Sequence, residues 1–398
     1  MAGVRVSELL VNSASCASAV CYLAAIAGSA YALFAIWAAR GFVRASPPSP
    51  PGICPPITIL KPLHGAEPSL YANLASFCNQ DYAAPFQIVF GIADSADPAA
   101  AVVRRLVDEF PGRDLTLVAN PRRHGSNAKV SNLINMQAEA QHEVLVIADS
   151  DIAVSNNYLT SVAASLGQPQ VGLVTCLYRG IGSTGLWSHL AAAGIDYQFL
   201  PNVLVGLKLG LASPCFGSTI ALTKTTLAKL RGLQSVADQL ADDYGLGMAT
   251  RRAGRKVAIP PFTVTHVCAE RSLRELLLHE IRWARTIRAM DPVGFAGLAI
   301  TYAVPLALIG LMLGGLTPAA VVVAAALGCR FALQAELNRL FQLRNAISWE
   351  MSLLGPIRDI LSFVIFVVSF FGRRVEWRGN VYDVSADNTL TRYGEAES

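Results

Sequence analysis

Charged residues are scarce in this chain. Only 15% of its 398 residues are Asp, Glu, Lys or Arg, while 53% are hydrophobic. An average soluble domain carries about 25% charged residues, so the composition argues against intrinsic disorder and against a fibrous repeat. The formal net charge of +4 does not indicate a basic nucleic-acid-binding protein, and we expect no nucleic acid partner.

The cysteines lack any pairing pattern. The sequence contains no C-x-x-C and no cysteine and histidine at zinc-ligand spacing. This argues against a disulfide-rich fold and against a structural zinc site. Reduced thiols in a cytoplasmic domain are the expected state of all eight cysteines. They are Cys16, Cys21, Cys54, Cys78, Cys176, Cys215, Cys268 and Cys329.

Long uncharged runs lie toward both ends of the chain. No charged residue occurs between Glu8 and Arg40. The apolar run 17–39 is long enough to cross about 30 Å of hydrocarbon as a helix, which predicts a transmembrane anchor within 1–44. A cleavable signal peptide is the alternative, but its apolar core would normally hold about 7–15 residues. Because Arg40 and Arg44 follow the run, the next domain is expected in the cytoplasm.

The second uncharged run, 292–329, is followed by a shorter apolar run, 360–371. Glycines and a proline at 314–318 divide the first run, which predicts a membrane hairpin with a short second span. The run 360–371 either spans the membrane or lies at its interface. Arginines in the tail, 373–398, favour the interfacial position, because three spans would keep them in the cytoplasm. We therefore assign 292–372 to transmembrane and interfacial helices.

A proline-rich linker, 45–56, precedes a segment with an α/β pattern, 57–270. Short apolar runs there alternate with helical patterns after Pro68, Pro98 and Ala128. This alternation is typical of a mostly parallel sheet, in which ligands bind beyond the carboxyl ends of the strands. The predicted strands are 57–60, 87–92, 115–119 and 144–148.

Carboxylates follow two of these strands. Asp94 lies just past the second strand, where it could accept hydrogen bonds from a base or ribose, whereas Asp97, which precedes a proline, is expected to cap a helix. Asp149 and Asp151 follow the fourth strand. A D-x-D there can direct oxygens at one Mg²⁺ or Mn²⁺ ion that also binds a diphosphate. Capping of the following helix is the alternative role for Asp151.

The segment 180–185 fits G-x-G-x-x-G, the pattern of a dinucleotide-binding loop. Such a loop belongs on the first strand of a βαβ unit, with an acidic residue about 20 positions further on. This segment comes after four predicted strands. We therefore expect a flexible turn rather than a nicotinamide site.

Acidic and basic residues then follow in succession. Asp242 and Asp243 open a predicted helix, where the helix dipole favours them and where one of them could act as a general base. The stretch 251–288 holds nine basic residues against three acidic ones. Because it leads into a membrane span, its amphipathic part, 271–291, is expected at the membrane surface, near anionic head groups or a substrate diphosphate.

Together with Arg282 and Trp283, these carboxylates stand in an order that resembles the membrane-bound family 2/21 glycosyltransferases. The resemblance runs from about residue 55 to 385 and is strongest to the ceramide glucosyltransferase group. Within that group the sequence is similar to bacterial hopanoid biosynthesis-associated glycosyltransferases. The shared positions are 60–65, 73–74, 81–82, 94, 97–98, 127–133, 242–244, 281–283 and 376–378.

The resemblance implies a GT-A fold and an inverting transfer of a sugar from a UDP-sugar to a lipid hydroxyl. It also implies a multi-pass protein of the bacterial inner membrane with a cytoplasmic catalytic domain. For donor binding, it implies that Lys61 and Asp94 hold the uridine part and that Lys129 assists at the nucleotide. Asp149 and Asp151 would hold the metal and the diphosphate.

For catalysis, the resemblance implies that Asp243 deprotonates the acceptor hydroxyl, with Asp242 as the second candidate. Arg282 and Trp283 would close over the donor and the leaving group. Two positions depart from the family pattern. His279 stands at the first position of the Q/R-x-x-R-W motif, which leaves its role open. Asp151 is a second aspartate that animal ceramide enzymes tend to lack.

Several functions remain open at this point. The leading hypothesis is transfer of N-acetylglucosamine to a hopanoid polyol such as bacteriohopanetetrol, and ceramide glucosylation from UDP-glucose is the first alternative. A processive polysaccharide synthase would carry the same carboxylates, but such enzymes usually need more spans than the three or four expected here. A catalytically silent membrane receptor or scaffold is the remaining class.

Overall fold

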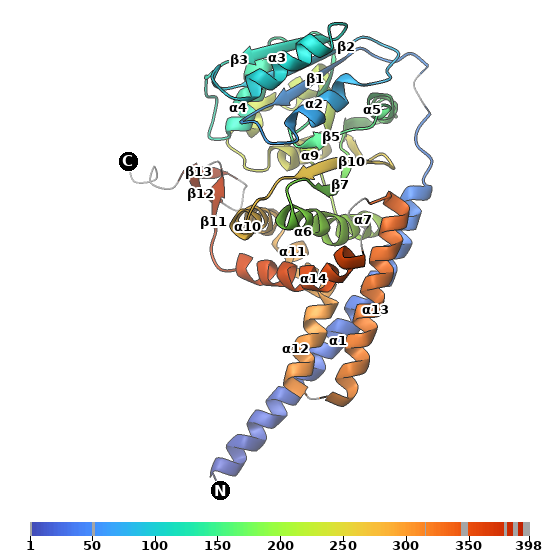
Figure 1. The fold of residues 1–398 in the computed structure, drawn as a ribbon, viewed down its shortest axis with the longest axis vertical. Coiled ribbons are helices and arrows are strands. Elements are labelled where there is room, and N and C mark those ends of the chain that lie inside the picture. The colour runs from blue at the N-terminus through green and yellow to red at the C-terminus, as the bar shows by residue number, and fades with distance from the viewer. Residues whose placement is uncertain are drawn as a thin grey trace. The chain divides into compact units, whose positions relative to one another are not determined.

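The computed structural model describes residues 2–49, 52–314, 316–343, 349–377, 380–384 and 389–392. The chain divides into two units (Figure 1). The α/β unit comprises 44–192, 213–278 and 373–398, and the helical unit comprises 1–43, 193–212 and 279–372. Gly315, expected at a helix break, and Arg378, part of a shared motif, lie outside the described residues.

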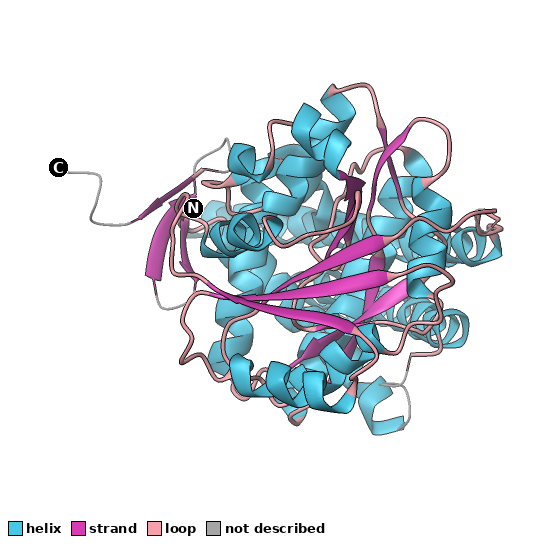
Figure 2. Ribbon diagram, turned by 90° about the horizontal axis from the view of Figure 1, so that it is seen from above, coloured by secondary structure: helices cyan, strands magenta, loops and turns pink. Residues whose placement is uncertain are grey.

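A seven-stranded sheet forms the centre of the α/β unit (Figure 2). The strand order is β3-β2-β1-β4-β8-β6-β9, in which β1 to β4 are parallel and β8 is antiparallel to both its neighbours. All four predicted strands are present, which confirms the expected α/β fold. The strands are β1 (Ile57–Pro62), β2 (Phe86–Ile92), β3 (Asp114–Ala119), β4 (Val144–Ile147), β6 (Val171–Val174), β8 (Ile220–Thr223) and β9 (Lys256–Ala258).

Helices cover both faces of this sheet. Successive strand residues point to opposite faces, so Ile57 and Ile59 join one apolar core while Leu60 joins the other. Burial on both faces explains why the strands read as continuous apolar runs rather than as alternating ones. The helices of the first core are α2 (Leu70–Cys78), α3 (Ala99–Glu109) and α5 (Tyr158–Leu166); those of the second are α4 (Ala128–Gln137), α8 (Lys224–Lys229), the 3₁₀ turn η2 (Leu233–Val236) and α9 (Asp242–Arg252).

Two three-stranded sheets complete the α/β unit. One has the order β5-β10-β7, and the other is an antiparallel sheet of residues near the C-terminus. The strands are β5 (Ile152–Ala153), β7 (Leu177–Gly182), β10 (Thr263–Cys268), β11 (Arg374–Trp377), β12 (Asn380–Val384) and β13 (Leu390–Arg392).

Only the second half of the glycine-rich segment 180–185 lies in a connection of the kind that its sequence predicted, because residues 183–185 join β7 to α6. Gly180 and Gly182 belong to β7, against which α6 (Leu186–Gly194) packs closely. A Cβ on Gly180 would lie 2.6 Å from Cα of Ala192, and one on Gly182 would lie 2.6 Å from the amide nitrogen of His189. These glycines are therefore required by the approach of helix to strand rather than by backbone freedom.

The helical unit holds most of the apolar excess. Three described helices are long and apolar enough to cross a membrane, Ser13–Arg44, Leu186–Leu209 and Ala319–Phe341, and a bent pair, 292–301 with 303–314, would be a fourth. The sequence patterns did not predict Leu186–Leu209, in which a π-helical turn joins two shorter helices. The second span of the predicted hairpin ended at residue 329, whereas the helix there continues to residue 341. The elements of this unit are α1 (Ala2–Arg44), the π-helical turn η1 (Ile195–Phe199), α7 (Leu200–Leu209), α10 (Leu273–Met290, of which 279–290 belong here), α11 (Pro292–Gly297), the 3₁₀ turn η3 (Leu298–Thr301), α12 (Ala303–Gly314), α13 (Leu316–Phe341) and α14 (Trp349–Ser369).

Helix α14 runs crosswise to α1, α12 and α13 (Figure 1). It buries Arg358, Asp359 and Ser362, while Ile357 and Val364 are exposed. A helix that hides its polar face and exposes its apolar face suits a lipid environment rather than water. The exposed apolar face of α14 and its course across the other helices favour the interfacial position expected for the run 360–371.

The packing of α6 on β7 predicts the effect of a single methyl group. Gly180→Ala should lower the free energy of unfolding by about 1–3 kcal/mol, because the new Cβ meets backbone atoms that cannot move aside. The measurement is the midpoint of thermal unfolding in one detergent. Gly112→Ala is the control, because its Cβ would meet nothing within 4 Å. Equal midpoints for the two variants would contradict the close packing.

Candidate active site

The predicted site residues of the sheet gather at one of its edges. Lys61 lies near the end of β1, Asp94 follows β2 and Asp149 follows β4. These three strands are parallel neighbours, so their carboxyl ends meet at the same edge. This is the place where an α/β sheet binds its ligands.

Lys129 joins two of the predicted carboxylates. Its Nζ lies 2.7 Å from Oδ1 of Asp149 and 3.2 Å from Oδ2 of Asp242. Lys129 stands in the first turn of α4, where Asn127 caps the helix by accepting hydrogen bonds from the backbone amides of Lys129 and Val130. Burial acts to lower the pKa of Lys129, but the surrounding carboxylates raise it above its usual value. The ammonium group therefore stays charged.

The adjacent aspartates of α9 have different surroundings. Asp242 is 5% exposed and is paired with Lys129. Asp243 instead accepts hydrogen bonds from the backbone amides of Gly217 and Tyr244, each at 2.7 Å. Burial and the neighbouring Asp242 raise the pKa of Asp243 to about 6, against the opposing effects of Lys129 and the amide of Tyr244. The carboxylate of Asp243 is therefore more basic than that of an ordinary aspartate.

Lys61 lies beneath the turn that carries Asp149. Its side chain is fully buried, its Nζ donates a hydrogen bond to the carbonyl oxygen of Asp149 at 2.6 Å, and it lies 3.9 Å from the ring centroid of Phe77. Burial lowers the pKa of Lys61 to about 7, although Asp151 and Asp149 oppose this shift. The observed contact supports the turn, and a direct contact of Lys61 with uridine stays a prediction.

The two aspartates that follow β2 have separate roles. Asp94 is exposed, and its Oδ1 accepts a hydrogen bond from the amide of Ala96. Asp97 accepts one from the amide of Ala99 at the start of α3, which confirms its predicted capping role, and it also binds the amide of Gly65. Contact of Asp94 with a nucleotide stays a prediction.

Asp151 has an oxygen suited to a cation. It lies in the turn between β4 and β5, and α5 begins after Asn157, so the alternative that Asp151 caps this helix is wrong. Its Oδ1 is buried and has no hydrogen-bond partner among the described residues, and Nδ1 of His266 lies 3.8 Å away. His266 was missed, because only the pairing of β10 with β5 brings it here.

Asp149 and Asp151 were predicted to hold a metal ion, and their oxygens can be compared with the ligands that such an ion requires. In the described part of the chain, no three His, Cys, Asp or Glu side chains converge as a complete metal site. Mg²⁺ is commonly held by one or two carboxylates, with waters and substrate phosphates supplying the other oxygens. Asp151, and the Oδ2 atom of Asp149 that Lys129 does not bind, fit that arrangement.

Gly217 is a second site residue that no sequence motif predicted. It lies between the carboxylates: its amide binds Asp243, its carbonyl accepts the amide of Asp149, and a Cβ on it would lie 2.5 Å from Oδ2 of Asp149. The same Cβ would lie 3.1 Å from Nζ of Lys129. No local pattern marks this glycine, because its neighbours come from distant parts of the chain.

The other predicted residues, His279, Arg282 and Trp283, lie on α10 in the helical unit. His279 and Trp283 are one turn apart, and their rings meet edge to face with centroids 4.3 Å apart. This contact gives His279 a role in holding the indole ring. Two arginines of the basic stretch have backbone partners: Arg285 donates to the carbonyl of Phe371 and Arg288 to that of Gly372.

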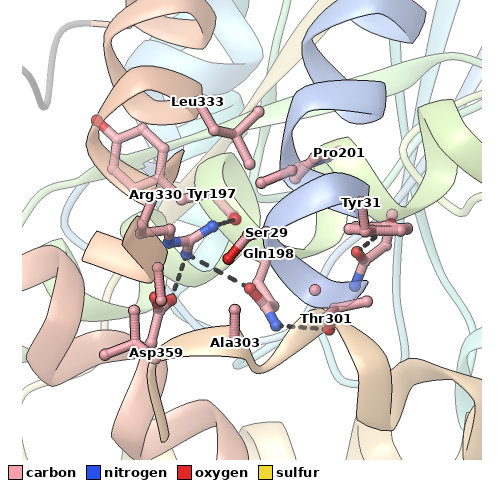
Figure 3. A pocket seen from close by; sticks show the side chains of 15 residues that line it. Ser29, Tyr31, Tyr197, Gln198, Pro201, Thr301, Ala303, Arg330, Leu333 and Asp359 are labelled. Atoms are coloured by element: carbon pink, nitrogen blue, oxygen red, sulfur yellow. Dashed lines mark hydrogen bonds and ion pairs between the residues drawn. The ribbon is translucent and has the colours of Figure 1, made fainter. Parts of the chain in front are cut away.

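A further polar cluster lies inside the helical unit (Figure 3). Arg330 of α13 forms an ion pair with Asp359 of α14 and donates to the carbonyl oxygen of Tyr197 at 2.7 Å. Beside them, Gln198 donates to Thr301 at 3.1 Å. These groups bind one another, so the cluster joins helices rather than presenting charge to a ligand.

Comparison with known proteins identifies the family. The profile of glycosyl transferase family 21 matches residues 20–390, which is nearly the whole chain. The chain belongs to this family. Its apolar helices agree with a membrane-associated protein.

Individual relatives are more distant. The chain is 24% identical to ceramide glucosyltransferase 1 of Caenorhabditis elegans over 239 residues, covering 60% of this chain and 51% of that protein. It is 28% identical to a ceramide glucosyltransferase of Candida albicans, covering 28% and 22%. The similarity thus spans about half, or less, of the length of these curated relatives. Among solved structures, a mannosyltransferase from Pyrobaculum calidifontis, in complex with GDP-Man and Mn²⁺, has a TM-score of 0.48 and 22% identity, covering 87% of this chain and 99% of that one.

Gly217 offers a test of the site's packing. Gly217→Ala should displace the carboxylate of Asp149, because the new Cβ falls within 2.5 Å of its Oδ2 atom. We expect UDP binding, measured by calorimetry, to weaken by about tenfold or more, since a shift of even 1 Å in a site is costly. Gly167→Ala is the control, because its Cβ would make only an ordinary contact at 3.4 Å. UDP affinity equal to that of the unaltered protein would contradict the arrangement.

Proposed function

We propose that this protein transfers a sugar from a UDP-sugar to a hydroxyl group of a membrane lipid, with inversion at the anomeric carbon. The observation that carries the proposal is the group of carboxylates around Lys129 at the carboxyl edge of the sheet, in a chain of glycosyl transferase family 21. A receptor or scaffold would have no need of an aspartate with a pKa raised to about 6 beside this group.

In this proposal Asp243 is the general base. Its carboxylate takes the proton of the acceptor hydroxyl as that oxygen bonds to the anomeric carbon and the bond from that carbon to UDP breaks. A pKa of about 6 leaves Asp243 ionised near pH 7 while keeping it more basic than an ordinary aspartate. Asp242 is less suited to this role, because it is already paired with Lys129.

The departing UDP carries negative charge, which positive groups must stabilise. We assign Arg282 and Trp283 to this step, as the resemblance implies. The ring contact of His279 with Trp283 would support the indole ring. Asp149 and Asp151 would hold Mg²⁺ or Mn²⁺ on the diphosphate. When bound, the cation would neutralise the charge on the phosphate oxygens.

We propose that the acceptor is a hopanoid polyol such as bacteriohopanetetrol and that the sugar is N-acetylglucosamine. We also propose that the chain is a multi-pass protein of the bacterial inner membrane. Asp151 supports this choice, because animal ceramide enzymes tend to lack an aspartate at this position. Ceramide glucosylation is the second candidate, since the curated relatives are ceramide glucosyltransferases.

An acceptor assay tests these alternatives. The purified full chain is incubated in detergent with UDP-N-acetylglucosamine or UDP-glucose, Mn²⁺, and either bacteriohopanetetrol or ceramide. We expect labelled sugar in the hopanoid. Label in ceramide alone would overturn the acceptor, and a ladder of products on a gel would instead identify a processive polysaccharide synthase.

The base assignment predicts both a variant and a pH dependence. Asp243→Asn should lower kcat by about 10²–10⁴-fold while UDP binding is kept, because an amide cannot accept the proton. In the unaltered protein, kcat/KM should fall as the pH drops below about 6, where Asp243 becomes protonated. A rate that stays constant down to about pH 4.5 would contradict a base with a raised pKa.

The cation prediction has a readout that does not depend on turnover. Asp151→Ala should remove the Mn²⁺-dependent part of UDP binding in calorimetry, because it deletes the buried Oδ1 atom that has no hydrogen-bond partner. UDP binding without the cation is the internal control. Unchanged Mn²⁺ dependence in both Asp149→Ala and Asp151→Ala would refute the assignment.

A further inference from the structure

A buried ion pair ties α10 to α14. Nη2 of Arg358 on α14 lies 2.6 Å from Oε2 of Glu280 on α10, and the two residues are 78 positions apart in the sequence. The Arg358 side chain is only 5% exposed, and that of Glu280 is 14% exposed. Because a buried charge is costly without its partner, this contact strongly restricts where the two helices can lie.

A second set of contacts holds the other end of the same helix. Arg285 donates to the carbonyl oxygen of Phe371 at 2.7 Å, and Arg288 donates to that of Gly372 at 2.6 Å, just past the end of α14. Between these contacts and the ion pair, Ala284 packs in an apolar cluster with Phe366 of α14. Helix α10 is therefore held along α14 at several points.

The predicted donor-closing residues lie outside the arc of α10 that carries these contacts. Successive residues of an α-helix are rotated by about 100°, so residues 280, 284 and 288, at intervals of four, share the side that meets α14. Arg285 lies about 140° from Glu280, so the residues with the contacts described above fall within an arc of about 140° that starts at Glu280. Arg282 and Trp283 lie at about 200° and 300°, about 60° beyond either end of that arc. Those contacts are therefore made by residues other than Arg282 and Trp283.

From this geometry we infer that α14 is the positioning element for Arg282 and Trp283, and that Glu280 and Arg358 are positioning residues for the transfer reaction. The ion pair sets the rotation and height of α10, and so the place of the guanidinium and indole groups. Neither Glu280 nor Arg358 needs to touch the substrate. The inference rests on the proposed function, because it assumes that Arg282 and Trp283 act on the donor.

The chain contains a matched control for this pair. Asp359, the next residue of α14, is also buried and also forms an ion pair, but its partner is Arg330 of α13. Breaking either pair leaves one buried charge without its partner. Only the Glu280–Arg358 pair involves the helix that carries Arg282.

The experiment compares the two pairs in the full chain, in one detergent. One series is Glu280→Gln, Arg358→Lys, Arg358→Met and the double variant Glu280→Gln/Arg358→Met; the other is Asp359→Asn, Arg330→Met and their double variant. The midpoint of thermal unfolding, kcat, and KM for the UDP-sugar are measured for each, at a temperature where all assayed variants are folded. Asp243→Asn marks the background rate.

We expect both series to lower the unfolding midpoint, but only the Glu280–Arg358 series to lower kcat, by about tenfold or more. Arg358→Lys keeps the charge and should keep much of kcat, and it still provides a reading if Arg358→Met fails to fold. Losses of kcat that follow the unfolding midpoint equally in both series would overturn the inference, as would an unchanged kcat in Glu280→Gln. If the unaltered chain transfers no sugar, the proposed function fails instead.

Discussion

The candidate active site depends on the placement of one largely buried ammonium group, that of Lys129. Lys129 lies between Asp149, from the turn after β4, and Asp242, from the first turn of α9. Without that positive charge, two carboxylates and the adjacent Asp243 would repel one another in a partly buried space. The position of Lys129 in turn depends on Asn127, which caps α4 and also donates a hydrogen bond to the carbonyl oxygen of Gln239, just before α9.

This arrangement separates the roles of two neighbouring aspartates. Asp242 forms an ion pair with Lys129, while Asp243 accepts hydrogen bonds from two backbone amides. The charge of Asp242 then contributes to the raised pKa of Asp243. The two adjacent aspartates thus differ in role because their surroundings differ: Asp242 is an ion-pair partner and Asp243 is a candidate base.

Buried charges in the helical unit are also paired, but there the pairs join helices. Arg330 pairs with Asp359, and Arg358 pairs with Glu280. Such pairs add little to stability compared with apolar packing, but they specify which helices meet and in what register. Apolar helices in a membrane need that specificity, because lipid offers no hydrophobic preference between them.

Much of the architecture was determined by local sequence. The strands and the helices after Pro68, Pro98 and Ala128 could be predicted, because strand and helix formation depend on periodicity, capping and proline, all within a few residues. The site residues Lys129, Asp149 and Asp243 were recognised from motifs. In contrast, Gly217, His266 and Glu280 carry no local signal, and Gly180 and Gly182 carried a misleading one. What only the tertiary structure decided is which distant groups meet, because close approach and charge pairing act through space and depend on the packing of the whole chain.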